Sequence, residues 1–254
     1  MTDAPLHTND FSKTADNALR LLLLISEAGP IPTGQLAERG SLHRSVVRRL
    51  VNTLLHHGFI WSTPAGYVVG PRVLALAEQV SPQLQVVMRP LMRELADEVG
   101  ETVLCTMRQG TDAVLLSQER GLRHLIRVED EPGSRHSVYL GASGPAILSL
   151  LQDAEIERCL ARASDEDAAR ARAHVAQARD QGYCRSSGER QRGVAAIAAP
   201  VAGPGGEALC SLGVIVPDIR EQSLTGFVSS LIDCARRAET LLSGTELAGR
   251  AGPA

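Results

Sequence analysis

Ten residues at positions 41–50, SLHRSVVRRL, place one histidine and three arginines among small and aliphatic side chains. A solvated helix face usually mixes acidic with basic residues, because opposite charges four positions apart support each other. Between residues 39 and 77 the chain has five arginines and three histidines but no aspartate or glutamate. This excess is local, because the whole chain carries a net charge of −3. Concentrated guanidinium groups are suited to binding phosphates and the acceptor edge of guanine.

The spacing of these side chains predicts a DNA-binding helix. Arg44 and Arg48 are four apart and share a helix face, and Arg49 lies one step round it. A hydroxyl in the first turn can donate to a phosphate beside free backbone N–H groups. The candidate DNA-binding residues are His43, Arg44, Ser45, Arg48, Arg49, Thr33 and Tyr67. Lys13 and the wing at 63–67 are secondary candidates, and a structural role is expected for Arg72. The alternative is a solvated surface helix. In that case the absence of acidic residues between positions 39 and 77 is a coincidence.

The flanking elements predict a winged helix-turn-helix. An amphipathic helix over residues 16–28 ends at a Gly-Pro pair, and Thr33 is expected to cap a short second helix. The basic helix follows within a few residues and ends near Gly58. Two β-branched or aromatic stretches then flank a Pro- and Gly-containing turn at 62–66, which indicates a hairpin.

The rest of the chain predicts a second, mixed domain, so the fold class is α+β. Strands are expected at 102–108, 113–119, 123–129, 193–201 and 207–217, and helices at 87–99, 144–151, 154–161, 165–181 and about 224–242. The expected divisions are a DNA-binding domain (11–70), a linker helix (71–87), a second domain with an antiparallel sheet (88–245) and a flexible tail (246–254).

Composition excludes several other classes of protein. The chain has 254 residues, 44% of them hydrophobic, and its longest apolar run, at 21–25, is too short to span a bilayer. Its start lacks the features of a signal peptide. The five cysteines are at least 24 residues apart, which favours neither a zinc site nor a disulfide framework. A cytoplasmic protein with no cofactor, metal or membrane partner is expected.

The sequence does not support an enzyme. Residues 141–146, GASGPA, hold a serine between glycines, but the spacing differs from the G-x-S-x-G of a nucleophile elbow. No Ser/His/Asp set, phosphate loop or metal motif is recognisable. An architectural DNA-binding protein without a ligand stays open as the alternative, although it leaves about 160 residues of the second domain without a purpose.

Six segments together resemble the IclR family of bacterial transcription regulators. The resemblance extends over about residues 11–245. It implies a dimer or dimer of dimers on a pseudo-palindromic operator. It also implies that residues 88–245 are a GAF-like effector-binding and oligomerisation domain with a small-molecule pocket. Ligand binding is then expected to change operator affinity. The segments are SKTADNALRLLLLI, GQLAERGSLHRSVVRRLVNTLLHHGFI, GYVVGPRVLALA, GETVLCTMRQGTDAVLLSQERG, QGYCRSSGERQRGVAAIAAPV and CSLGVIVP.

Five positions depart from the polar residues with which such regulators hold small carboxylates. Tyr139 takes the place of a loop histidine, Ser186 that of an acid and Ala196 that of a cysteine. Gly213 and Ile215 take the places of two serines. A buried carboxylate without donors is costly to desolvate, so the pocket is expected to disfavour compact acids.

A larger, partly apolar or aromatic effector is therefore expected. Contacts with Ser143, Ser186 and either Tyr139 or Met107 would orient this effector in the pocket. A filled or vestigial pocket is the alternative. The candidate effector-binding residues are Met107, Tyr139, Ala142, Ser143, Ser186, Ala196, Gly213 and Ile215.

Overall fold

A computed structural model describes residues 12–77 and 82–250 of the chain. The chain divides into two units, Met1–Pro82 and Gln83–Ala254. Residue 11 of the expected DNA-binding domain, residues 78–81 of the expected linker and residues 251–254 of the expected tail lie outside the described residues.

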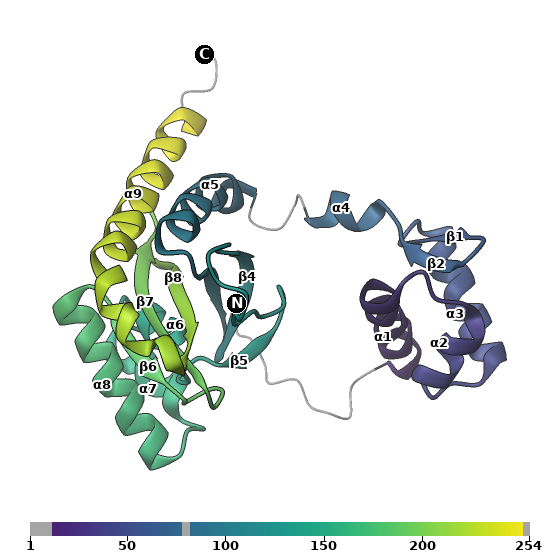
Figure 1. Cartoon of the computed structure of the whole chain (residues 1–254), viewed down its shortest axis with the longest axis horizontal. Helices are drawn as coiled ribbons and strands as arrows, with labels where there is room; N and C mark the ends of the chain where they lie inside the picture. Colours follow the sequence, from purple (N-terminus) through teal and green to yellow (C-terminus); the bar gives the residue numbers. More distant parts are fainter. Residues whose placement is uncertain (1–11, 78–81, 251–254) are drawn as a thin grey trace. The chain divides into compact units, whose positions relative to one another are not determined.

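The N-terminal unit consists of three helices, a hairpin and a further short helix (Figure 1). Its elements are α1 (Lys13–Ala28), α2 (Thr33–Arg39), α3 (Arg44–His56), β1 (Ile60–Thr63), β2 (Gly66–Val69) and α4 (Arg72–Ala77). Apolar residues at helical spacing on α1, α2 and α3 form one core that also takes Ile60 from β1. This is the predicted winged helix-turn-helix order.

The hairpin is attached to the helices by backbone contacts. Ile31, between α1 and α2, exchanges two hydrogen bonds with Tyr67 of β2, with N···O distances of 3.1 and 2.9 Å. Gly66, at φ +136°, comes so close to this segment that a Cβ there would lie 2.4 Å from the Ile31 carbonyl carbon. Only glycine fits this approach, which fixes where the wing leaves the core.

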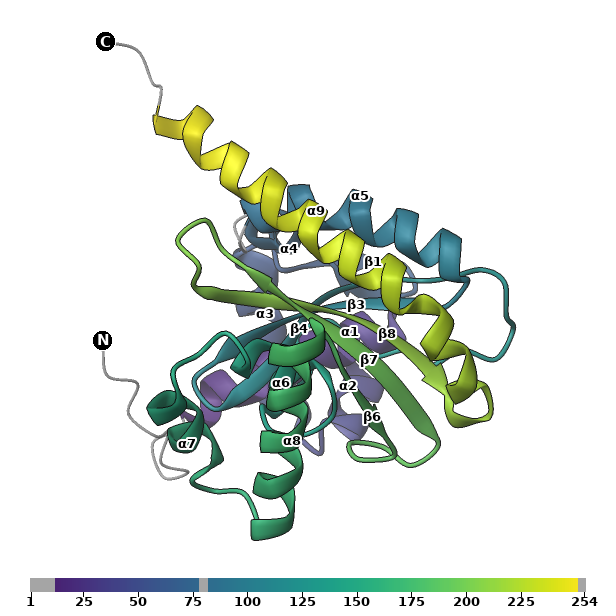
Figure 2. The same ribbon diagram turned by 90° about the vertical axis from the view of Figure 1, so that its left-hand side faces the viewer.

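The C-terminal unit is built on a six-stranded antiparallel sheet with the order β5-β4-β3-β8-β7-β6. Helices cover both faces, with α5 and α9 side by side on one and α6 and α8 on the other (Figures 1 and 2). The elements are α5 (Pro82–Val99), β3 (Thr102–Gln109), β4 (Asp112–Glu119), β5 (Arg135–Ser137), α6 (Ser143–Leu148), α7 (Asp153–Leu160), α8 (Asp165–Gln181), β6 (Cys184–Ser187), β7 (Val194–Ala202), β8 (Ala208–Pro217), the 3-10 helix η1 (Asp218–Ser223) and α9 (Leu224–Arg250).

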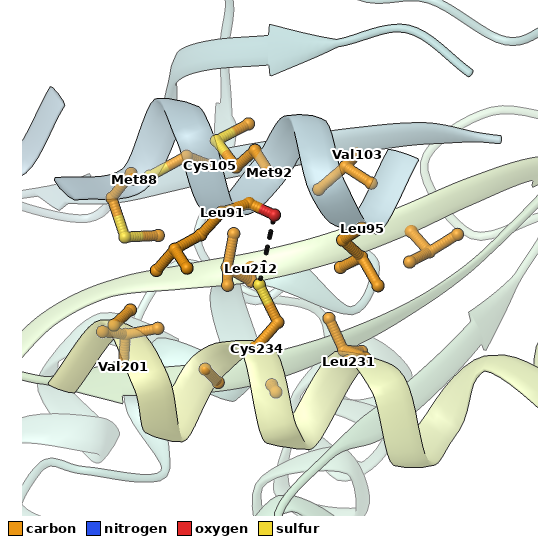
Figure 3. Packing of buried hydrophobic residues seen from close by; sticks show 14 of the residues in the cluster. Met88, Leu91, Met92, Leu95, Val103, Cys105, Val201, Leu212, Leu231 and Cys234 are labelled. Carbon is orange, nitrogen blue, oxygen red and sulfur yellow. Dashed lines mark hydrogen bonds between the residues drawn. The ribbon is translucent and has the colours of Figure 1, made fainter. Parts of the chain in front are cut away.

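Alternation along the central strands separates a packed face from a face that holds a cavity. On β3, Val103 and Cys105 point toward α5 and α9, whereas Leu104 and Thr106 point the other way. The first face forms the largest core cluster, in which Met88, Met92 and their neighbours meet Leu212 and Leu231 (Figure 3). The Sγ of Cys234 donates to the Leu91 carbonyl at 3.6 Å and links α9 to α5 in this core.

Together the two units confirm the expected α+β fold class, with an N-terminal helix-turn-helix and a C-terminal antiparallel sheet with helices. No described helix is long and apolar enough to cross a bilayer.

Several expected boundaries were wrong. Thr33 is not a cap, because Pro32 occupies the N-cap position and no side chain caps α2. The helix expected from residue 87 begins at Pro82, whose missing N–H is tolerated in a first turn. Residues 123–129 form no strand, and β4 pairs with the short β5 instead. The last helix, expected to end near residue 242, extends to Arg250.

Candidate functional site

The basic surface of α3 is exposed and unpaired. Arg44, Arg48 and Arg49 are all exposed to solvent. None of the three makes an ion pair or side-chain hydrogen bond with another residue in the described part of the chain. On the opposite side of the helix Val47 and Leu50 are buried in the core. The helix therefore presents free guanidinium groups outward while its apolar side holds it in place.

His43 and Ser45 organise the start of α3. The Nδ1 atom of His43 accepts a hydrogen bond from the Ser45 backbone N–H at 3.3 Å and lies 2.8 Å from the Ser45 hydroxyl. Because Nδ1 accepts, the ring proton of the neutral form is on Nε2. Both side chains are exposed, so this N-cap sits on the same outward surface as Arg44.

Thr33 and Tyr67 lie together where α2 meets the wing. The Thr33 hydroxyl donates to the Tyr67 hydroxyl at 3.4 Å, and both residues are partly buried. Thr63 closes the hairpin by donating to the Gly66 carbonyl at 2.7 Å. Five of the seven candidate DNA-binding residues thus lie at or next to the start of α3, and two lie at the wing.

The C-terminal unit holds a cavity between the start of α6 and the sheet face that carries Leu104 and Thr106. Its volume is about 50 Å³, which is room for a few water molecules. The floor is apolar and the rim carries hydroxyl, carboxylate and guanidinium groups. The lining residues are Leu104, Thr106, Leu115, Asp130, His136, Gly141, Ala142, Ser143, Ser186, Glu189, Arg190, Gln191, Val194, Ala196 and Ile215.

Five of the eight candidate effector-binding residues line this cavity: Ala142, Ser143, Ser186, Ala196 and Ile215. Gly213 lies close by, since a Cβ built there would be 3.4 Å from the Ser143 hydroxyl oxygen. Met107 packs against the core on the opposite face of the sheet, and Tyr139 packs against the cluster under α7 and α8. The structure therefore does not bring Met107 or Tyr139 to the cavity lining.

Gly144 fixes the distance between α6 and the turn that follows β5. A Cβ on Gly144 would lie 1.9 Å from the Val138 carbonyl oxygen, so only glycine fits. This contact holds Ala142 and Ser143 at the edge of the cavity.

The charged groups of the cavity were not predicted from the sequence. Arg190 pairs with Asp130, 60 residues away, and its Nη1 lies 3.4 Å from the Nδ1 of His136. Burial, assisted by the Arg190 charge, lowers the pKa of His136 from 6.5 to about 4, so the imidazole is neutral at pH 7. These residues lie in irregular segments and a three-residue strand. Such segments have no repeating pattern of apolar residues from which their positions could be predicted.

Glu189 is the second carboxylate of the lining. Its side chain is 9% exposed, and its Oε1 accepts from the Nε2 of His174 at 2.7 Å. The other oxygen, Oε2, is buried without a hydrogen-bond partner among the described residues. The nearest paired cation is Arg170, whose Nε lies 3.9 Å from Oε2, beyond hydrogen-bond range.

Other reactive groups in the described residues are arranged for packing. No group of three or more His, Cys, Asp or Glu side chains in residues 12–77 and 82–250 could hold a metal ion. All five cysteines are free and buried. Burial raises the pKa of Cys184 to about 12 and that of Cys234 to about 11, so both thiols are protonated at neutral pH.

Comparison with known proteins identifies both units. The bacterial transcriptional regulator IclR C-terminal domain matches residues 79–240, and the IclR helix-turn-helix domain matches residues 14–63. The regulator BhcR of Paracoccus denitrificans is 28% identical over 238 residues, which cover 88% of this chain and 85% of BhcR. The Pca regulon regulatory protein of Pseudomonas putida is 26% identical over 190 residues, which cover 71% of this chain and 65% of that protein.

Solved structures show the same fold. The crystal structure of an IclR homolog complexed with 4-hydroxybenzoate, from Microbacterium hydrocarbonoxydans, superposes with a TM-score of 0.72 and 18% identity. The superposition covers 91% of this chain and all of the homolog.

Proposed function

Because the chain belongs to the IclR family of bacterial transcriptional regulators, we propose that it binds a pseudo-palindromic DNA operator and releases or engages it in response to a small-molecule effector. The family consists of regulators rather than enzymes, and the proposed function involves no catalysis. The site of action is the cytoplasm, where the DNA is. The proposed divisions are DNA binding by residues 11–70, linkage by 71–87 and effector binding by 88–245, with 246–254 as a tail.

The observation that carries the DNA-binding proposal is the set of unpaired arginines on α3. Exposed Arg44, Arg48 and Arg49 have no acidic partner among the described residues, so their charge is available to phosphates or guanine edges. The second helix of a helix-turn-helix pair enters the major groove with its N-terminal residues toward the bases. His43 and Ser45 lie at that end of α3, and Thr33 and Tyr67 lie at the wing, where backbone contact is proposed.

Self-association is part of the proposal. One winged helix with three arginines holds DNA weakly at physiological salt, whereas two half-sites bound together gain from effective concentration. Exposed apolar side chains on the N-terminal unit support a dimer contact: Leu19 and Leu23, one turn apart on α1, are 61% and 60% exposed. Leu74 on α4 is 68% exposed. Dimers, or dimers of dimers, are therefore proposed.

The effector is proposed to bind at the cavity lined by Ser143, Ser186 and Ala196. A ligand that favours one arrangement of the effector domains changes operator affinity only by its differential binding to the two arrangements. The complex of the Microbacterium homolog with 4-hydroxybenzoate supports a small-molecule ligand for this fold. The alternative, an architectural DNA-binding protein with a vestigial pocket, has the same DNA-binding surface but no such linkage.

Selection from a random DNA library tests the proposal. We expect recovered sequences to contain two inverted half-sites, with centres separated by about 10 base pairs or a multiple of that spacing. A small-molecule screen for thermal stabilisation should then find a compound that also changes affinity for the recovered DNA. Recovery of DNA without sequence preference, together with no stabilising compound, would support the architectural alternative.

A further inference from the structure

Glu189, a lining residue of the cavity, has one carboxylate oxygen with no hydrogen-bond partner among the described residues. The Oε2 of Glu189 is buried without a hydrogen-bond partner, although Glu189 lines the cavity and its side chain is nine-tenths buried. A buried polar atom without a partner destabilises the fold by the desolvation free energy of that atom. Such an atom beside a cavity indicates that something else supplies the donor.

The charges around the cavity favour a donor over an acid. Arg190 is the only lysine or arginine among the described lining residues, and Asp130 already pairs with it. His136, beside Arg190, is neutral at pH 7 because burial lowers its pKa to about 4. Arg190 is balanced by Asp130. Arg170 lies 3.9 Å from the Oε2 of Glu189, but this cation also pairs with Asp167 and Glu166, so it balances the Glu189 carboxylate only in part. A carboxylate ligand would therefore meet repulsion and no free cation.

The opposite side of the cavity is apolar. Leu104, Leu115, Val194, Ala196 and Ile215 come from four neighbouring strands and present aliphatic surface to it. A ligand with a short hydrocarbon part can be buried there while a polar group reaches the rim. The cavity volume of about 50 Å³ favours a compact molecule over the larger effector expected from the sequence.

We propose that Glu189 is the specificity-determining residue of the effector site and that it accepts a hydrogen bond from an N–H or O–H group of a compact, partly apolar ligand. The ligand class is a protonated amine or an alcohol, and the partly balanced negative charge of the lining disfavours simple carboxylates. The hydroxyl groups of Ser143 and Ser186 are available to the same polar group. This inference depends on the proposed effector site but not on the DNA-binding surface.

Matched probes separate these ligand classes. Propylamine, 1-propanol and propanoate share one hydrocarbon shape and differ in the polar group, as do benzylamine, benzyl alcohol and benzoate at a larger size. Binding to the full chain is measured by titration calorimetry and thermal shift. In both series we expect the amine or the alcohol to bind about tenfold or more tightly than the carboxylate, as expected for a hydrogen bond to a charged group.

Two variants assign the selectivity to Glu189. Glu189→Gln keeps the acceptor for His174 but replaces the charge by an amide, so the preference for the donor probes should fall about tenfold. The control is Glu157→Gln, which removes an exposed carboxylate outside the lining and should leave the ranking unchanged. Ala196→Leu fills the cavity from the sheet without changing Glu189, and should abolish binding of every probe.

The outcomes are distinct. Tighter binding of the carboxylates by the unmodified chain, an unchanged ranking in Glu189→Gln, or no binding of any probe would overturn the assignment. Probe binding that survives Ala196→Leu would place the ligand elsewhere and also overturn it. None of these results bears on DNA binding, so failure of this inference leaves the DNA-binding proposal to its own test.

Discussion

Glu101→Gln should unfold the C-terminal unit more easily than any comparable change at an exposed ion pair. Glu101 lies between α5 and β3, and its carboxylate holds Arg220 of η1 through two bonds, Nε–Oε1 at 2.6 Å and Nη2–Oε2 at 2.9 Å. The Glu101 side chain is 2% exposed and that of Arg220 is 20% exposed. The same arginine also donates to the Ile126 carbonyl at 2.9 Å, which ties the segment after β4 to this pair.

The magnitude follows from burial. The Glu101 carboxylate raises the pKa of Arg220. The guanidinium stays charged at neutral pH even without this partner, because arginine is protonated far above that pH in any setting. Breaking one side of a buried ion pair costs about 3–5 kcal/mol, because the remaining charge stays desolvated. Since Arg220 keeps a fifth of its exposure and one carbonyl acceptor, we expect about 3 kcal/mol, the lower end of that range.

The chain contains a matched control. Arg172 and Glu157 make the same two-bond contact, at 2.8 and 2.6 Å, but their side chains are 51% and 54% exposed. Glu157→Gln should therefore leave stability nearly unchanged, because water replaces the missing partner. The two variants differ in burial and not in chemistry.

Urea unfolding with two signals measures both variants. Far-ultraviolet circular dichroism reports all helices and strands, whereas the single tryptophan, Trp61, reports the N-terminal unit. Glu101→Gln should lower the midpoint of the main dichroism transition and leave the tryptophan transition in place. Equal losses in Glu101→Gln and Glu157→Gln would refute the argument from burial.

Other parts of the structure give three further predictions. Gly144→Ala should lower the melting temperature and weaken probe binding at the cavity, since its Cβ has no room beside the Val138 carbonyl; an unchanged melting temperature would contradict the close approach. The neutral His136 stabilises the fold above its unfolded pKa of 6.5, and this contribution is lost as pH falls toward about 4, because the unfolded chain binds the proton more readily. As the pH falls from 6.5 to about 4, His136→Gln should therefore lose less stability than the unmodified chain, by at most about 3 kcal/mol. Urea unfolding at a series of pH values measures the difference. An equal loss in both proteins would argue against a neutral ring at His136. Sedimentation should show a species of at least twice 27.1 kDa, and the double variant Leu19→Ser, Leu23→Ser should shift it toward the monomer; a monomer in the unmodified chain would contradict the proposed dimer.

Periodicity predicted the elements with strong local signals. The apolar residues of α3 recur at helical spacing, and the strands β3, β4, β7 and β8 are long, apolar and bounded by turn residues. These segments carry the core and the candidate DNA-binding surface. Their positions could therefore be inferred from the residue pattern.

The segment after β4 shows why pattern alone fails elsewhere. Residues 123–129 have the composition of a strand, yet Gly121 turns the chain tightly over Glu101, where a Cβ would lie 2.2 Å from the Gly100 carbonyl carbon. Arg123 then donates to the carbonyls of Glu98 and Val99. Side-chain contacts with residues distant in the sequence hold this segment in place, so it does not need to pair with a β-strand.

The cavity was only partly predictable for a similar reason. Residues on regular strands, such as Ala196 and Ile215, could be assigned to one face by alternation once their register was known. Asp130, Glu189 and Arg190 lie in connecting segments and meet only through tertiary folding. Met107 was expected at the site. It lies two residues after Cys105 on β3, so its side chain points to the same face of the sheet, toward α5 and α9.

The most direct test of the central claim is operator binding by the triple variant Arg44→Ala, Arg48→Ala, Arg49→Ala. Affinity for the selected DNA is measured over a range of salt concentrations, with Arg20→Ala, an exposed arginine of α1, as the control. Each base-reading arginine should contribute about 1–3 kcal/mol, and removal of each phosphate-binding arginine should reduce the salt slope by about one. We predict a folded triple variant that no longer discriminates the selected DNA from random DNA. A triple variant that binds the selected DNA as tightly as the unmodified chain would contradict the account.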